Sequence, residues 1–151
     1  MKKLTFSYLA ILLVCSGALA QSDETAMTRE AITRYLDSNH KDLSMLADDV
    51  EFTNMATGEK HTGREAIGEM LHYVYHVAFD ATADLRNLIV EHNRAVLEAE
   101  IVGKHIGEFA GVAATNKDVR IPLCVIYDLD NGKITHGRIY LEVPALMAQI
   151  R

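Results

Sequence analysis

The sequence predicts an α+β domain in which helices come first and antiparallel strands follow. Three observations predict it: apolar residues recur at helical spacing in the first half, apolar and polar residues alternate in the second half, and an Asn-Gly pair separates the last two alternating segments. A doubly wound parallel sheet would need strands and helices to alternate along the chain, and they do not.

Two long helices and two shorter ones are expected. Helical spacing covers residues 25–39 and 63–79, a short helical turn is expected over 42–47, and a last short helix over 143–150. The second long helix should present a wide apolar face, which consists of Ile67, Met70, Leu71, Val74, Val77 and Ala78.

Strands are predicted over residues 50–55, 85–91, 95–105, 119–129 and 134–142. The segment 92–94 has the composition of a turn between two of them. Asn131-Gly132 favours a type I′ turn, so the last two strands should form a hairpin.

The first twenty residues have the pattern of a secretory signal peptide. Lys2 and Lys3 give a basic start, residues 4–14 form an apolar run, and Ala18-Leu19-Ala20 supplies a small-x-small cleavage site. The run is shorter than the roughly 20 residues that a membrane-spanning helix needs, so no stable membrane anchor is expected. We predict a signal peptide over 1–20 and one domain over 21–151, exported to the periplasm or secreted. Lipidation of Cys15 is an alternative, which Val14 before it disfavours.

Charge and cysteine content exclude several partners and chemistries. Removal of Lys2 and Lys3 from 15 basic residues, against 21 acidic ones, leaves a mature net charge of about −8. With no basic cluster, binding to nucleic acid or to an anionic membrane is not expected. The mature chain keeps only Cys124, which lies in an apolar run and is expected to be a core residue rather than a nucleophile.

Side-chain alternation selects candidate pocket residues on two strands. On the 95–105 strand, His105 shares a face with apolar residues and should point inward. On the last strand His136, Arg138, Tyr140 and Glu142 share one face, but both faces are mixed and alternation does not decide which one is buried.

An ordered set of residues in the second half resembles the SnoaL-like polyketide cyclase family, within the nuclear-transport-factor-2-like superfamily. The likeness extends weakly back through Asp84-Leu85 and residues 62–67 to the first helix. The matching residues are Gly103, His105, Gly107, Phe109, Gly111, Thr115, Lys117, Pro122, Gly132, Lys133, Ile134, Arg138 and Gln149.

The resemblance implies a cone-shaped, curved antiparallel sheet wrapped around the N-terminal helices, with a deep cavity and a homodimer formed through the outer sheet surface. In the family's cyclases a pocket aspartate acts as acid and base in an aldol ring closure without metal or cofactor. Glu142 looks like the matching carboxylate and His105 like the family histidine. The other expected pocket residues are Arg138, Tyr140, Phe109 and Tyr75.

Two departures from the family pattern bear on this expectation. Glutamate is one methylene longer than aspartate, and proton transfer tolerates little misplacement. Asn116 replaces a glycine in the segment that should lie at the pocket mouth.

The residues leave enzyme and binding module open as alternatives. In a dry pocket, burial would raise the pKa of the Glu142 carboxyl, and His105 beside it could polarise a carbonyl. Alternatively, Glu142 pairs with Arg138 or with solvent, and His105 is a core residue. His72 and His76 have zinc-ligand spacing but fall on a charged stripe, so neither metal nor cofactor is expected.

The function predicted from the sequence is the binding of a small, mainly apolar molecule. Cofactor-free acid/base catalysis of the cyclase, isomerase or hydrolase type is a possible addition. A non-catalytic carrier or interaction module of the same fold is the alternative.

Overall fold

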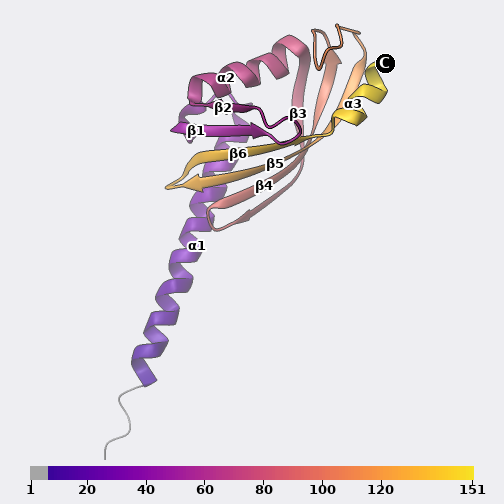
Figure 1. The fold of residues 1–151 in the computed structure, drawn as a ribbon. Coiled ribbons are helices and arrows are strands. Elements are labelled where there is room, and N and C mark those ends of the chain that lie inside the picture. Colours follow the sequence, from indigo (N-terminus) through magenta and orange to yellow (C-terminus); the bar gives the residue numbers. More distant parts are fainter. Residues whose placement is uncertain (1–6) are drawn as a thin grey trace, which may run out of the picture.

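A computed structural model describes residues 7–151, so the basic start of the expected signal peptide lies outside the described residues. Helix α1 (Ser7–Asp37) comes first and its C-terminal part contacts the sheet, whereas its earlier part extends away from the rest of the chain (Figure 1). None of the helices in the described part is both long and apolar enough to span a membrane.

Six strands form one curved sheet in the order β2-β1-β6-β5-β4-β3. The pairing of β1 with β6 is parallel and every other pairing is antiparallel. The strands are β1 (Leu46–Asn54), β2 (Lys60–Thr62), β3 (Phe79–Glu91), β4 (Arg94–His105), β5 (Asp118–Asp130) and β6 (Lys133–Leu141).

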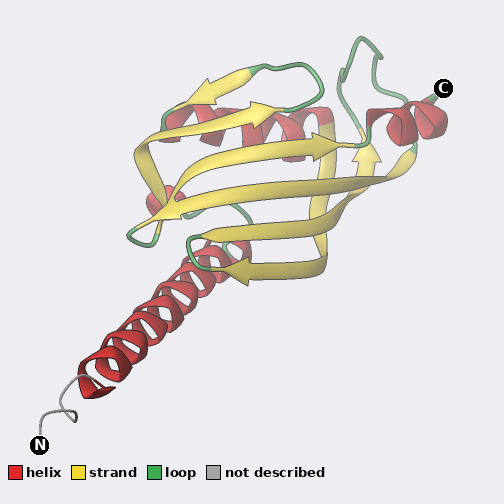
Figure 2. Cartoon of the chain, turned by 60° about the horizontal axis from the view of Figure 1, so that its bottom comes forward, coloured by secondary structure: helices red, strands yellow, loops and turns green. Residues whose placement is uncertain are grey.

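Helices cover the inner face of this sheet. The 3-10 turn η1 (Leu43–Met45) follows α1, and α2 (Arg64–His72) continues directly into the π-helix η2 (Tyr73–Ala78). Figure 2 shows α2 lying behind the strands, and α3 (Val143–Ile150) at the far end of the chain. The predicted α+β class and the curved sheet around N-terminal helices are confirmed.

The strand β3 begins earlier than the sequence suggested, and the helix before it ends earlier. Residues 79–84 alternate Phe79, Ala81 and Ala83 with polar residues, and alanine is a weak strand former that gives little signal. The Ala78 carbonyl accepts N–H bonds from Ile106 and Gly107 at 3.0 and 2.9 Å, which ties the helix end to the chain beyond β4. The short strand β2 was not predicted.

The two turns with clear sequence signals have the expected backbone. Asn131 and Gly132 have φ of 47° and 71°, the positive values that a type I′ turn requires, so that prediction is confirmed. Asn116 has φ of 56°, a conformation that glycine and asparagine adopt most readily. Asparagine is therefore compatible with the backbone that glycine would adopt at this point.

The core lies between the inner face of the sheet and the helices. On β4 the residues Ala95, Leu97, Ala99, Ile101 and His105 are all buried, as alternation predicted. Burial of the apolar side chains in this core contributes about 25 cal/mol for each Å² of apolar surface removed from water and is the main source of stability.

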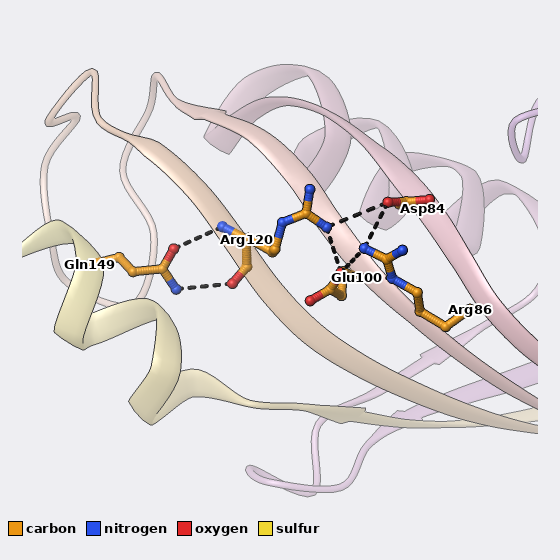
Figure 3. Close-up of polar contacts among 5 residues, drawn as sticks. All are labelled: Asp84, Arg86, Glu100, Arg120 and Gln149. Carbon is orange, nitrogen blue, oxygen red and sulfur yellow. Dashed lines mark hydrogen bonds and ion pairs between the residues drawn. The ribbon is translucent and has the colours of Figure 1, made fainter.

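Helix α3 is attached to β5 by a side chain that imitates strand pairing. The Gln149 amide accepts the Arg120 N–H at 2.8 Å and donates to the Arg120 carbonyl at 2.9 Å (Figure 3). The Arg120 guanidinium in turn lies on the outer face and bridges Glu100 and Asp84, where Arg86 joins them. Hydrogen bonds from Arg86 and Arg120 lower the pKa of Glu100, so this cluster stays ionised.

Candidate functional site

A cavity of about 600 Å³ lies between the inner face of the sheet and the segment formed by α2 and η2. This volume is within the range of small-molecule sites. Most of its wall is apolar, and the sheet contributes Leu97, Ile101, Leu123, Val125, Ile139 and Leu141. Alternation on β4, β5 and β6 directs all six inward, because neighbouring residues on a strand point to opposite faces.

A histidine follows the end of α1 and forms part of the cavity wall. His40 has φ of 61°, a strained backbone that places its ring between two tyrosines. The ring stacks on Tyr75 with centroids 5.2 Å apart and planes 16° apart, and it meets the edge of Tyr35 at 5.2 Å. Burial lowers the pKa of His40 to about 4, so the imidazole is uncharged at neutral pH.

Tyr35 and Tyr75 contact this imidazole, and a third tyrosine, Tyr127, contacts Tyr35. Tyr127 from β5 meets Tyr35 at 6.1 Å and Phe52 at 6.0 Å between ring centroids. Burial raises the pKa of all three phenols, to about 12 for Tyr75, and the neighbouring tyrosines add to the effect at Tyr35 and Tyr127. The Tyr35 hydroxyl is buried and has no hydrogen-bond partner among the described residues. This end of the cavity is therefore polar but uncharged.

The acidic residues of the wall are exposed to solvent. Glu59 and Glu69 are exposed, and His61 is half-buried with its Nε2 3.6 Å from a Glu59 carboxylate oxygen. Among the described residues of the wall, these two glutamates are the only acidic ones, and lysine and arginine do not occur there. The exposed part of the wall thus carries negative charge.

Phe109 and Tyr75 line the cavity, and His105 lies behind its wall. The Phe109 ring contacts Phe79 at 5.0 Å, and Phe79 contacts His105 at 5.3 Å. His105 is fully buried, its Nδ1 is 3.0 Å from the Thr115 hydroxyl, and its Nε2 has no partner among the described residues. Its inward orientation agrees with alternation on β4, but it is not one of the lining residues.

The placement of Arg138, Tyr140 and Glu142 in the cavity is corrected by the structure. Ile139 and Leu141 occupy the inward face of β6, so the polar residues that alternate with them point outward. Arg138 binds Asp128 at 2.6 Å on the outer face, and Tyr140 is 44% exposed. Burial opposes ionisation of Asp128, but hydrogen bonds from Arg138 and Arg94 outweigh it and lower its pKa.

Glu142 is exposed at the start of α3, where its backbone N–H donates to the Pro122 carbonyl at 3.0 Å. It is absent from the cavity wall, as is His105. The two residues expected to act as an acid/base pair therefore do not meet in one cavity. The chain turns out of the sheet at this residue to begin a helix, and strand alternation does not predict that change of direction.

Sequence reasoning missed His40 and Tyr127. His40 lies in a loop, and no periodicity connects that loop to the sheet. Tyr127 did carry a signal, because it shares its face of β5 with Leu123 and Val125. His72 and His76, the pair with zinc-ligand spacing, are exposed with rings 5.4 Å apart. No group of three or more metal-binding side chains lies among the described residues.

Solved structures with this architecture include three bacterial proteins. One from Jannaschia sp. CCS1, assigned to the SnoaL-like polyketide cyclases, has a TM-score of 0.76 at 18% identity, covering 84% of this chain and 93% of its own. One from Xanthomonas campestris pv. campestris, assigned as a polyketide cyclase, has a TM-score of 0.70 at 21% identity, with 85% and 99% covered. One from Catenulispora acidiphila DSM 44928, with a ketosteroid isomerase-like fold and bound trimethylamine, has a TM-score of 0.66 at 17% identity, with 80% and 92% covered.

At these identities the three structures show the shared fold and no more. No curated protein matches the chain. The family model described as SnoaL-like polyketide cyclase matches residues 29–150, which is most of the sequence. The chain belongs to the SnoaL-like polyketide cyclase family.

Proposed function

We propose that this protein binds a small, mainly apolar molecule inside its cavity. The observation that carries the proposal is the wall itself: about 600 Å³ of space bounded mostly by aliphatic and aromatic side chains. An apolar ligand gains from leaving water, and a concave apolar wall with few polar groups is the usual form of such a site.

Binding is a better supported activity than acid/base catalysis by Glu142 and His105. A general acid or base must reach the reacting atoms, and Glu142 is exposed on the outside of the domain. His105 is separated from the cavity by the rings of Phe79 and Phe109. We therefore place the ligand against Leu97, Ile101 and the other aliphatic residues of the wall and assign no chemical step.

Filling the cavity should abolish binding. Ile101→Trp adds an indole on the inner face of β4, and we expect it to weaken binding of the naphthalene ketone prodan at least about tenfold, because ring and ligand would occupy the same space. The measurement is prodan fluorescence, whose emission shifts to the blue in apolar surroundings. Val102→Trp, the next residue and on the outer face, is the matched control and should bind as the unchanged protein does.

If Ile101→Trp folds, as shown by circular dichroism, and still binds prodan with unchanged affinity, the ligand does not occupy this cavity. The proposal would be contradicted directly if the unchanged protein bound neither prodan nor the matched ligands acetylnaphthalene, ethylnaphthalene and naphthoate.

We further propose that the chain is exported and that the mature protein begins at Gln21 and pairs as a homodimer. The basic start, apolar run and Ala18-Leu19-Ala20 support export, and the first part of α1 extends away from the sheet (Figure 1). Exposed apolar side chains on the outer sheet face, among them Ile89 at 58%, support pairing.

One experiment addresses both parts of this proposal. Native mass spectrometry of protein purified from its own host should give twice the mass of residues 21–151. A mass equal to the full chain, or an added lipid on Cys15, contradicts cleavage at this point, and a single copy contradicts the dimer.

A further inference from the structure

We propose that the His40 end of the cavity recognises an uncharged oxygen group, a ketone or a hydroxyl, on an otherwise apolar ligand. His40, Tyr75 and Tyr127 would supply the hydrogen bonds. This inference rests on the proposed ligand binding and adds to it a chemical class of ligand.

The first support is the position of the three polar residues. His40, Tyr75 and Tyr127 belong to the cavity wall and come from three separate parts of the chain: the loop after α1, η2 and β5. The His40 ring lies 5.2 Å from the rings of both Tyr75 and Tyr35, and Tyr35 lies 6.1 Å from Tyr127, so Tyr35 connects the three into one cluster. Phenol hydroxyls donate and accept, and an imidazole has one nitrogen of each kind, so the cluster can bind either oxygen group.

The second support is the kind of ligand that the cluster would reject. Burial lowers the pKa of the His40 imidazole to about 4, so it is uncharged at neutral pH, as are the three phenols, whose pKa values burial raises above their ordinary value near 10. A carboxylate placed here would lose its hydration without gaining a cation, which is costly. The exposed part of the wall adds to this, because Glu59 and Glu69 give it a negative charge that repels anions.

The third support is the cost of forming this cluster. His40 holds φ of 61° and the residue before it, Asn39, holds 52°, two left-handed residues in succession. The buried Tyr35 hydroxyl next to the cluster is left without a partner among the described residues. Strain and unsatisfied polar groups lower stability, and they persist where a binding function depends on them.

Competition between matched naphthalenes tests the inference. Acetylnaphthalene carries a ketone, ethylnaphthalene has nearly the same shape without the oxygen, and naphthoate is an anion at neutral pH. From the displacement of prodan, we expect a dissociation constant about fivefold to tenfold lower for acetylnaphthalene than for ethylnaphthalene, the difference that one hydrogen bond allows. Naphthoate should bind most weakly of the three. The chain contains no tryptophan, so naphthalene fluorescence is read without that background.

Variants locate the hydrogen bond. Tyr127→Phe removes one hydroxyl, and His40→Phe removes both ring nitrogens while keeping a ring to stack on Tyr75. Each should reduce the preference for the ketone over the hydrocarbon and leave ethylnaphthalene binding nearly unchanged. Tyr140→Phe, the same change on the exposed outer face, is the control and should alter neither.

The outcomes separate this inference from the proposal beneath it. If all three naphthalenes displace prodan equally, or if the ketone preference survives in both variants, the inference is overturned while cavity binding stands. If prodan and all three naphthalenes fail to bind the unchanged protein, both are overturned.

Discussion

Gly103→Ala is expected to destabilise the domain by about 3 kcal/mol or more, or to prevent folding, because the added methyl group has no space. A Cβ at Gly103 would collide with the Asp80 carbonyl oxygen and lie 2.5 Å from the Ala81 Cα. Both atoms belong to the backbone of β3, so no change of rotamer can relieve the contact. The two strands must move apart where β3 and β4 pair at Ala81 and Gly103.

A loss of this size is large relative to the total stability of a domain of this length. Total stability is about 5–15 kcal/mol, so the loss is a large share of it. Urea unfolding followed by circular dichroism measures the change in the midpoint, and the soluble yield gives a second readout if the variant does not fold.

Gly111→Ala is the matched control. Gly111 has φ of 76°, but no atom lies within 4 Å of the position that the new methyl group would take, so the cost is limited to about 1 kcal/mol of backbone strain. Equal unfolding midpoints for Gly103→Ala and the unchanged protein would show that the strands are not held this closely.

The sequence could predict the features that depend on residues close together along one strand, helix or turn. Alternation placed Leu97, Ile101 and His105 on the inner face, and Asn131-Gly132 specified its turn, because both depend on neighbouring residues alone. The parallel pairing of β1 with β6 is a contact between distant segments and leaves no local pattern. Residue patterns were therefore sufficient for the fold class but insufficient for the order of strands in the sheet.

The site was harder to predict because it depends on tertiary contacts. Arg138 faces outward because Ile139 and Leu141 occupy the inner face of β6, and on the outer face it pairs with Asp128, a partner that the sequence of β6 alone does not indicate. His40 reaches the cavity through two left-handed residues after α1, a path that periodicity cannot predict. Tyr75 and Phe109 line the cavity, but His40 and Tyr127, which line it as well, were not expected from the sequence.

His40 should make the stability of the protein fall as the solution becomes mildly acidic. Its pKa is lowered from 6.5 to about 4 by burial, so between these values the unfolded chain binds a proton that the folded protein does not. Stability rises with pH wherever the unfolded state binds more protons. The contribution is complete above about pH 6.5 and is lost as the pH falls toward about 4, reaching a loss of about 2 kcal/mol near pH 5.

Other groups also titrate as the solution becomes acidic, so the experiment compares two variants. Asp128 and Glu100 have lowered pKa values and their stabilising ion pairs weaken on protonation in every form of the protein. The rings that contact His40 are those of Tyr35 and Tyr75, phenols that stay uncharged throughout this range. The difference between His40→Phe and the unchanged protein therefore isolates the imidazole.

Urea unfolding at about pH 7.5 and about pH 5 gives the two free energies needed for each protein. His40→Phe should lose about 2 kcal/mol less than the unchanged protein between these conditions, since phenylalanine has no proton to bind. His76→Phe, which removes an exposed histidine from η2, should follow the unchanged protein. If both variants lose the same stability as the unchanged protein, His40 takes up its proton without unfolding, and the end of the cavity is open to water rather than dry.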